Sequence, residues 1–504
     1  MALFSDKKTK PVACVPSVPS VPLCPFQLWY HRFFSGDGVK LVKGETVETE
    51  VTSAAYEGVG VARVNELVVF VRGGVPGDRV LARILRSKKR YAEAVVEQIL
   101  QPSPQRVEPV CSYFQICGGC TWQNADYELQ LQFKRQQVAD LFCRIGGLSD
   151  VQVNPTLPSP KLYHYRNKME FTFGSRRWLT REEIADPGPA NKEFALGLHV
   201  PQRFDKVLDI ERCHLATLVT SEIVNHVRRV AQGNDWAPYD TIKHEGYLKN
   251  LVIRVSEFSQ QVLVNLVTTE RHTSRMEFLA RELVSRFPQV TTVVNSVNAS
   301  RSPVATGEEE IYYGSGSLVE KIGPVAYTLE ASTFFQPNTL QAERLYGVVR
   351  DFARLSGRET LLDLYCGIGG ITLFLADQVA QAIGVENQAR SVELARQNAA
   401  ANSTENCEFL ESDAAAYMRE TAGRSSPPPD VVTIDPPRVG MHPDLVESLL
   451  RLGPRRIVYV SCNPATQARD LEVLTGQYAV EKIQPVDMFP HTYHIENVVA
   501  LERR

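Results

Sequence analysis

Cys462 follows an apolar run in the stretch "YVSCNPAT", residues 459–466. The apolar residues predict a buried strand, and the Asn-Pro pair predicts the turn that ends it. A free cysteine in such a place usually fills space as a small apolar side chain. It can also act as a nucleophile, which requires a base within reach and a substrate cleft in front of the thiol. The rest of the sequence decides between these two interpretations.

Acidic residues follow four successive strand-like runs in the last third of the chain. They are Asp363, Glu386, Asp413 and Asp435. The first lies in a glycine-rich turn, "LDLYCGIGG", which lets the backbone approach a ligand, and an acid ending the next strand can accept both hydroxyls of a ribose. A single acid in such a place is more often a cap or turn residue. Four in this order are the layout of S-adenosylmethionine-dependent methyltransferases, and the turn lacks the G-x-G-x-x-G pattern of nicotinamide-binding domains.

A cysteine beside a methyl donor favours one reaction, the methylation of pyrimidine C5. This carbon is a poor nucleophile until a thiolate adds at C6, and a base must later remove the C5 proton so that the enzyme is released. His491, His494 and Glu496 precede the last strand in "MFPHTYHIENVV". A histidine in such a turn is more often a packing or hydrogen-bonding residue, so we assign the base to Glu496.

Three kinds of scaffold are expected to position these residues. Strands alternate with amphipathic helices in residues 331–504, which predicts a Rossmann-like, doubly wound and mostly parallel sheet with ligands at the strand C-terminal ends. Residues 43–103 contain short β-type runs between glycine turns, which predicts a small OB-like β-barrel. Residues 104–330 mix strands and helices as an α+β domain. The predicted fold class is α/β with these two additional domains.

The chain as a whole has 504 residues, of which 55 are basic and 58 acidic, so any nucleic-acid surface must be local. Residues 1–42 are acid-poor and contain "VPSVPSVPLCP", which favours a disordered extension but also allows a targeting segment or a start-site artefact. No run approaches the roughly 18 apolar residues of a membrane helix. We expect no membrane span, a monomer without an obligate protein partner, and a cytoplasmic or, if residues 1–42 are a targeting segment, organellar location.

Five segments together resemble the RNA uridine-C5 methyltransferases: "STFFQPNTLQAERLY", "LDLYCGIGG", "IDPPRVG", "YVSCNPAT" and "HTYHIENV". The resemblance extends over residues 43–504. It implies S-adenosyl-L-methionine as methyl donor, Cys462 as nucleophile, Glu496 as base, and a TRAM domain, an RNA-binding barrel, at residues 43–103. The implied cofactor contacts are Gln336, Tyr365, Gly370, Glu386, Asp413 and Asp435. The family often has Asn in place of Gly370, so only a backbone contact is expected there.

A second group of cysteines is spaced for a metal centre. Cys111, Cys117 and Cys120 form a Cys-x5-Cys-x2-Cys cluster, and Cys213 in "ERCHL" is a distant fourth. Four thiolates suit either a [4Fe-4S] cluster or structural zinc, so their number does not choose between them. The spacing resembles the branch of the family that carries a [4Fe-4S] cluster, which implies such a cluster with a folding or RNA-positioning role.

The resemblance to this branch implies that the chain forms 5-methyluridine in structured RNA. Ribosomal RNA of the 23S type is the expected substrate, and transfer RNA is the alternative. In the barrel's basic stretch, Lys88, Lys89 and Arg90 are candidate phosphate contacts. Arg166 and Lys168 are further candidate RNA contacts.

Two other functions remain open. Asp435-Pro-Pro-Arg438 is similar to an amino-methylation motif, but such enzymes usually place an aromatic residue after the prolines and need no cysteine. A cluster-bearing RNA-binding protein without catalysis would bind RNA and transfer no methyl group.

Overall fold

The structure is a computed structural model that describes residues 41–185, 192–201, 203–302, 304–421 and 428–504. The predicted extension at residues 1–42 lies almost entirely outside these ranges. None of the helices in the described ranges has the length and apolar character needed to cross a membrane.

The first described domain is a closed five-stranded barrel with the strand order β1-β2-β3-β5-β4, as the sequence predicts. Side chains in β4 alternate, so that Val80, Ala82 and Ile84 fill the interior. A short 3-10 turn, η1 (Tyr56–Gly58), follows the first strand. The strands are β1 (Thr46–Ala54), β2 (Gly60–Val64), β3 (Leu67–Arg72), β4 (Arg79–Ser87) and β5 (Tyr91–Gln101).

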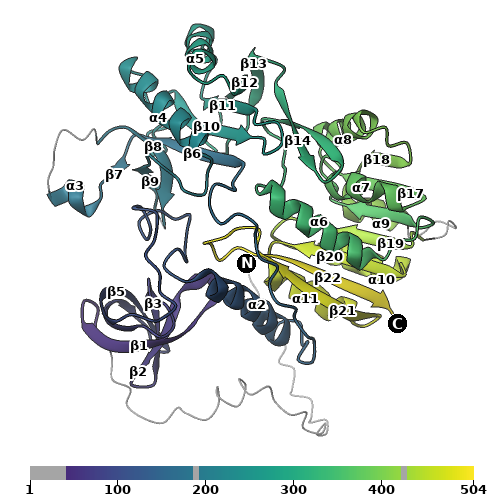
Figure 1. Cartoon of the computed structure of the whole chain (residues 1–504), viewed down its shortest axis with the longest axis horizontal. Helices are drawn as coiled ribbons and strands as arrows, with labels where there is room; N and C mark the ends of the chain where they lie inside the picture. The colour runs from purple at the N-terminus through teal and green to yellow at the C-terminus, as the bar shows by residue number, and fades with distance from the viewer. Residues whose placement is uncertain (1–40, 186–191, 202, 303, 422–427) are drawn as a thin grey trace, which may run out of the picture. The chain divides into compact units, whose positions relative to one another are not determined.

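A mixed eight-stranded sheet forms the centre of the next region, in the order β13-β12-β11-β10-β6-β8-β9-β7. Helices α4 (Leu218–Gly233) and α5 (Thr273–Arg286) share one hydrophobic core with it and lie beside it in Figure 1. The strands are β6 (Lys168–Gly174), β7 (Arg177–Trp178), β8 (Ala195–Val200), β9 (Arg203–Asp209), β10 (Leu248–Val255), β11 (Val262–Thr268), β12 (Val290–Val297) and β13 (Glu308–Tyr313). The remaining elements are α3 (Arg181–Ala185) and the hairpin β14 (Ser317–Ile322) and β15 (Val325–Glu330).

The C-terminal sheet has seven strands in the order β18-β17-β16-β19-β20-β22-β21. All neighbouring strands are parallel except β22, which runs antiparallel to both β20 and β21. The predicted doubly wound, mostly parallel sheet is confirmed. The strands are β16 (Thr360–Leu364), β17 (Gln381–Glu386), β18 (Cys407–Glu411), β19 (Val431–Ile434), β20 (Arg456–Ser461), β21 (Tyr478–Val486) and β22 (Glu496–Arg503).

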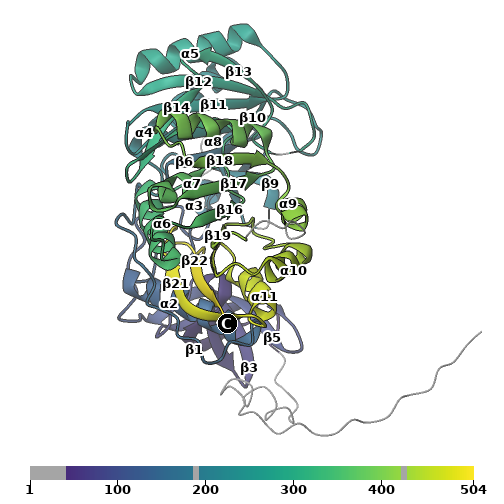
Figure 2. The same cartoon turned by 90° about the vertical axis from the view of Figure 1, so that its right-hand side faces the viewer.

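Helices cover both faces of this sheet, as Figures 1 and 2 show. One hydrophobic core joins the sheet to α6 (Thr339–Ala353), α7 (Gly370–Leu375) and α8 (Ala389–Ala401). The other core joins it to α9 (Ala414–Thr421), α10 (Pro443–Leu452) and α11 (Pro464–Leu474). Helix α2 (Tyr127–Arg144), which follows the cysteine-rich loop, also packs into this second core through Val138 and Phe142. The cysteine-rich region is thereby attached to the sheet that carries Cys462.

Candidate active site

Cys462 lies in the tight turn between β20 and α11. Asn463 caps α11, because its side chain accepts a hydrogen bond from the backbone N–H of Ala465 at 3.2 Å, and Pro464 begins the helix. The Asn463 amide also donates to the backbone carbonyl of Arg438 at 3.0 Å. The "SCNP" sequence therefore fixes the turn and leaves the thiol half-buried.

Three strand ends meet at this turn. β19 ends just before Asp435 and β20 ends just before Cys462, and these strands are parallel neighbours. β22 runs the opposite way, with Asn497 opposite Ser461, so its first residue, Glu496, lies at the same edge of the sheet. The structure thus brings the predicted nucleophile and the predicted base together, and Asp435 joins them.

The Cys462 thiol is surrounded mainly by groups that oppose its ionisation. Burial raises its pKa to about 12, together with repulsion from Glu496 and Asp435, whereas the charge of Arg438 and a hydrogen bond from it lower the pKa. Without substrate, the sulfur is therefore a neutral thiol at pH 7. Arg438, which the sequence analysis considered only as a departure from the amino-methylation motif, is a cation that favours the thiolate.

The neighbouring carboxyl groups are also perturbed. Glu496 is only 4% exposed, and burial raises its pKa well above the usual range, with a further increase from Asp435 and a decrease from Arg438. Burial raises the pKa of Asp435 to about 7, and the charge of Asp363 adds to this. Adjacent carboxyls in a dry site are costly to ionise together, so this pair retains a proton near neutral pH.

Backbone N–H groups in and near the glycine-rich turn fix the position of the Glu386 carboxylate. The Glu386 carboxylate accepts hydrogen bonds from the backbone N–H groups of Gly367 at 3.1 Å, and of Asn387 and Gln388 at 2.9 Å each. Asp363 instead faces the interior and accepts hydrogen bonds from the hydroxyls of Thr372 at 2.6 Å and Thr433 at 2.7 Å. Of these two acids, Glu386 is the one available to a ligand, and Asp363 joins β16 to α7 and to β19.

The same turn contains Tyr365 and Gly370. Asp413 follows β18, and its charge acts on Tyr365. Tyr365 adopts the left-handed conformation (φ 65°), and burial raises its pKa to about 12, with a further contribution from the charge of Asp413. Gly370 begins α7, and a Cβ there would lie 2.6 Å from the Tyr346 hydroxyl oxygen. The Asn that the family often has would therefore need Tyr346 to move. The backbone contact of Gly370 with the cofactor stays a prediction.

Gln336 is held by a residue that the sequence analysis did not single out. The Asn167 amide donates to the Gln336 carbonyl at 3.0 Å and to the Thr339 hydroxyl at 2.9 Å. The Asn167 backbone pairs with Pro337 and Val255, and its N–H donates to the Pro337 carbonyl at 2.8 Å. The "YRNKMEF" segment, which also contains the candidate RNA contacts Arg166 and Lys168, is thereby attached directly to the predicted cofactor segment.

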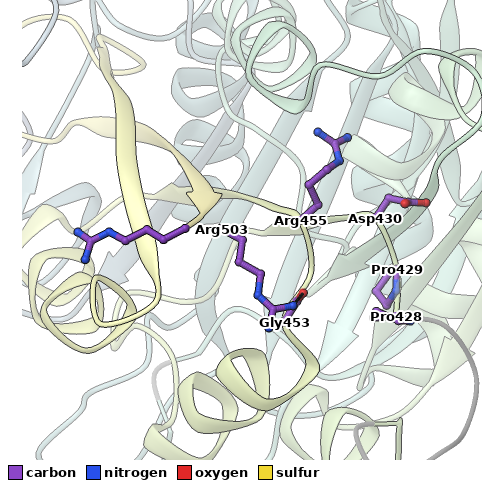
Figure 3. A pocket seen from close by; sticks show the side chains of 7 residues that line it. Pro428, Pro429, Asp430, Gly453, Arg455 and Arg503 are labelled. Carbon is purple, nitrogen blue, oxygen red and sulfur yellow. Dashed lines mark hydrogen bonds between the residues drawn. The ribbon is translucent and has the colours of Figure 1, made fainter.

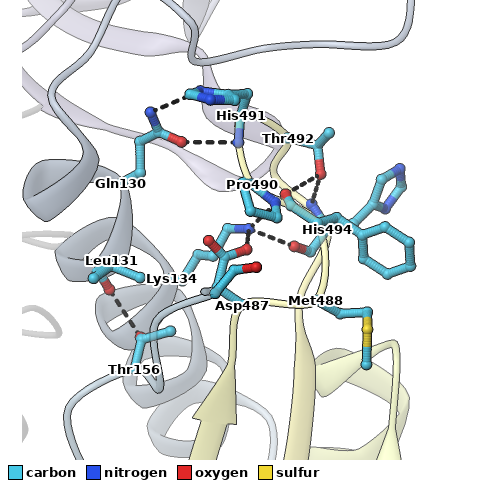
Figure 4. Close-up of polar contacts among 12 residues, drawn as sticks. Gln130, Leu131, Lys134, Thr156, Asp487, Met488, Pro490, His491, Thr492 and His494 are labelled. Atoms are coloured by element: carbon cyan, nitrogen blue, oxygen red, sulfur yellow. Dashed lines mark hydrogen bonds and ion pairs between the residues drawn. The ribbon is translucent and has the colours of Figure 1, made fainter. Parts of the chain in front are cut away.

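A buried ion pair fixes the loop that leads to Glu496 (Figure 4). The Lys134 ammonium group of α2 lies 2.5 Å from the Asp487 carboxylate and donates to the carbonyls of Phe489 at 3.0 Å and His494 at 2.8 Å. The Tyr127 hydroxyl donates to the other Asp487 oxygen at 2.8 Å. Lys134 and Asp487 are both inaccessible to solvent, so each needs its partner.

The two histidines of this loop are weak bases. Burial lowers the pKa of His491 to about 4, with help from Lys134, and it lowers the pKa of His494 to about 4, with help from Arg438 and Lys134. The Gln130 side chain accepts a hydrogen bond from the His491 backbone N–H at 3.0 Å, and the His491 ring stacks on Tyr163. These contacts fit the interpretation of both histidines as packing residues.

The four cysteines of the second group line one cavity of about 190 Å³. Burial raises the pKa of Cys117 and of Cys120 to about 12, and the charges of the other cysteines raise both further. Within the residues that the structure describes, no three His, Cys, Asp or Glu side chains are placed so that a single metal ion could bind them. The four cysteines that line this one cavity are a donor set that suits either a [4Fe-4S] cluster or zinc.

A larger cavity, of about 350 Å³, lies at the other end of the C-terminal sheet (Figure 3). Its lining includes Asp430, just before β19, Arg455, just before β20, and Arg503, at the end of β22. These positions are at the opposite strand ends from Cys462, so this cavity does not belong to the candidate active site.

Comparison with known proteins agrees with this chemistry. A family model described as tRNA (Uracil-5-)-methyltransferase matches residues 255–504, and a TRAM domain model matches residues 40–96. An uncharacterised RNA methyltransferase of Chlorobaculum tepidum is 41% identical over 94% of this chain and 99% of its own length. The chain belongs to the RNA uracil-5-methyltransferase family. A second relative, from Bacteroides thetaiotaomicron, is 40% identical over 89% of this chain and 100% of its own length.

A solved structure supports the assignment to this RNA uracil-5-methyltransferase family. The Pyrococcus abyssi tRNA (uracil-54, C5)-methyltransferase, in complex with S-adenosyl-L-homocysteine, is 29% identical, with a TM-score of 0.70 over 90% of this chain and 100% of its own. The protein is therefore an S-adenosylmethionine-dependent RNA (uracil-C5)-methyltransferase, and the N-terminal barrel is its TRAM domain.

Removal of one charge of the Lys134–Asp487 pair should destabilise the protein strongly. We expect Lys134→Met to lower the free energy of unfolding by about 3–5 kcal/mol, because Asp487 is left buried without its cation. Lys134→Met combined with Asp487→Asn should cost less than the sum of the two single variants, as measured by urea unfolding. Additive losses would contradict this account of the pair.

Alkylation of Cys462 should become faster with pH without levelling off. Because the thiolate reacts and the pKa is about 12, the rate with iodoacetamide should rise about tenfold per pH unit between about pH 7 and 10. Arg438→Met should slow the reaction, and Arg419→Met, a change at an exposed arginine that is not among the charges acting on Cys462, should not. Mass spectrometry of the Cys462 peptide gives the rate, and a plateau near pH 9 would contradict the raised pKa.

Proposed function

We propose that the protein forms 5-methyluridine at a specific uridine of structured RNA, with Cys462 as nucleophile and Glu496 as base. The observation that carries the proposal is the meeting of a half-buried thiol and a buried carboxyl group at the ends of two antiparallel strands. Two such groups on opposite sides of a flipped-out base can act on C6 and C5 of one pyrimidine ring.

The proposed reaction begins with the transfer of the Cys462 proton to solvent water, and the positive charge of Arg438 favours the thiolate that remains. The sulfur forms a bond to C6 of the uracil, and the electron pair of the C5–C6 double bond moves to C5. Bound S-adenosylmethionine would supply a methyl group, which the C5 electron pair takes up as the methyl–sulfur bond breaks and S-adenosylhomocysteine leaves.

Glu496, once it has lost its own proton to solvent, completes the proposed reaction by accepting the C5 proton. The electrons of the C5–H bond re-form the double bond, the C6–sulfur bond breaks, and Cys462 is released. The high pKa of Glu496 makes it a stronger base than His491 or His494, whose pKa values are about 4. The charge of Asp435 raises the pKa of Glu496 further, which strengthens Glu496 as a base.

We propose that the methyl donor contacts the six residues predicted from the sequence. Glu386 already accepts three backbone N–H groups, which holds its carboxylate rigid for a pair of ribose hydroxyls. Asp413 and Tyr365 lie beside the same turn, and the charge of Asp413 acts on the Tyr365 hydroxyl.

We also propose that the domains extend over residues 43–103, 104–330 and 331–504, and that the protein is a monomer.

The proposed substrate is ribosomal RNA of the 23S type. Its support is the resemblance of the four cysteines to the iron-sulfur branch of the family. A second candidate is transfer RNA, which the name of the Pyrococcus abyssi relative favours for that protein. Both present uridines in loops, where a base can leave the stack at low cost.

A covalent trap tests the proposed function. Deproteinised total RNA from bacteria grown with 5-fluorouracil carries fluorine at C5, which cannot leave as a proton, so a denaturation-resistant complex should accumulate in the presence of S-adenosylmethionine. We expect Cys462→Ala to abolish this complex and Cys407→Ala, which removes another half-buried cysteine of the same sheet, to retain it. Sequencing the attached RNA identifies the substrate. An adduct in the Cys462→Ala variant would refute the assignment of the nucleophile.

We further propose that Cys111, Cys117, Cys120 and Cys213 bind a [4Fe-4S] cluster. Protein purified without oxygen should contain about four iron and four sulfide ions per chain. Cys117→Ala should lose them and unfold at lower temperature, whereas Cys143→Ala, a change at a half-buried cysteine of α2, should keep them. Stoichiometric zinc in place of iron would contradict the cluster.

A further inference from the structure

An exposed aromatic residue of the TRAM barrel lies at the edge of the active site. Tyr56, in the turn η1, is 44% exposed, and its ring meets that of Tyr493 edge to face with 6.1 Å between the centroids. Tyr493 belongs to the loop that leads to Glu496, and its ring packs on His494 at 4.2 Å. Tyr56 of the barrel therefore adds a third ring to the contact between Tyr493 and His494, which lie on the loop before Glu496.

The Tyr56 hydroxyl also lies within electrostatic reach of the reacting groups. Burial raises its pKa, Tyr493 and Glu57 raise it further, and Arg438 and Cys462 act on it in opposite directions. Arg438 acts on Tyr493 as well. The two tyrosines therefore lie within electrostatic reach of the cation that faces the Cys462 thiol.

The turn that carries Tyr56 is held rigidly. Glu57 and Gly58 both adopt the left-handed conformation, with φ of 66° and 81°. The Trp122 indole N–H donates to the Gly58 carbonyl at 3.1 Å, and a Cβ on Gly58 would lie 2.4 Å from the same indole nitrogen. A left-handed non-glycine residue costs free energy, so the surrounding contacts must hold this turn in place.

Tyr56 is not needed to attach the barrel. Asn124 donates to the Gly73 carbonyl at 3.0 Å, and Arg106 donates to the same carbonyl at 2.7 Å while it pairs with the buried Asp78. These contacts, with that of Trp122, already join the barrel to the loop before α2. Tyr56 is 44% exposed, so part of its side chain remains accessible to a ligand.

We infer that the Tyr56 ring is a stacking surface for the RNA base next to the uridine that reaches Cys462. The inference rests on the proposed function. A base that leaves its stack exposes the faces of its neighbours, and an aromatic side chain at the entrance of the site can replace the lost stacking. Aromatic rings stack on any base, so Tyr56 adds affinity without reading sequence. The TRAM barrel thereby takes part in the site itself and is more than a tether for distant RNA.

The test uses full-length protein, S-adenosylmethionine and the 5-fluorouridine-containing total RNA described above. Tyr56→Ala should lower the second-order rate constant of adduct formation about 5- to 150-fold, the change that corresponds to the stacking of one base. Tyr56→Phe should restore the rate, because it keeps the ring. Tyr313→Ala is the matched control, since Tyr313 has the same 44% exposure but lies on β13 of the central sheet.

Ultraviolet irradiation of the wild-type adduct provides a second readout. After nuclease and protease digestion, mass spectrometry should find a nucleotide attached to the peptide that contains Tyr56. The inference is overturned if Tyr56→Ala reacts as fast as Tyr313→Ala, or if the adduct gives no cross-link at Tyr56. It is also overturned if the rate falls together with the midpoint of thermal unfolding, which would assign Tyr56 to packing. Absence of any adduct in the wild type would refute the proposed function and this inference with it.

Discussion

The reversed direction of β22 is the constraint on which the candidate site depends. In a sheet of parallel strands, all the strand C-terminal ends lie at one edge and all the starts at the other. Because β22 is antiparallel, its first residue, Glu496, is placed beside Cys462 at the end of β20 and Asp435 after β19. A parallel last strand would put Glu496 at the edge where Arg456 begins β20. One reversal of strand direction therefore brings a carboxyl group to the thiol.

The loop between β21 and β22 fixes the position of Glu496. This loop is itself held in place by a segment from elsewhere in the chain. Lys134 of α2 binds Asp487 at one end of the loop and the His494 carbonyl at the other. The backbone N–H groups of Thr121 and Trp122 donate to the His491 carbonyl at 2.9 and 3.1 Å. Both residues follow Cys120 directly. The cysteine-rich region thus contacts the loop before Glu496, which gives a physical route for the proposed cluster to support the site.

Much of this arrangement follows from local sequence signals. Alternating strands and helices predict the sheet, and "SCNP" predicts a strand end, because Asn463 caps the helix that Pro464 begins. The pairing of Lys134 with Asp487 could not be predicted, since their positions differ by 353 residues. Only a weak signal exists: Lys134 lies in the apolar stripe of α2 with Leu131 and Val138, where a charge needs a buried partner.

Other features of the site could not be predicted from the sequence, because they arise from contacts between segments that are distant in the chain. The role of Arg438 depends on the position of its side chain beside Cys462, and that of Asn167 depends on its contact with Gln336. Tyr56 reaches the site only through the packing of the barrel turn on Trp122. Spacing in the sequence records none of these contacts, because each joins segments that come together only in the folded chain, either across neighbouring strands of one sheet or between domains.

The central claim is that Cys462 and Glu496 divide the reaction between them, and the fate of the C5 proton tests it most directly. Glu496→Gln would be incubated with S-adenosylmethionine and RNA that carries tritium at C5 of uridine. Methyl transfer to the RNA without release of tritium to water, together with accumulation of the covalent complex, is the predicted result. Release of tritium at the wild-type rate would contradict the assignment of the base to Glu496.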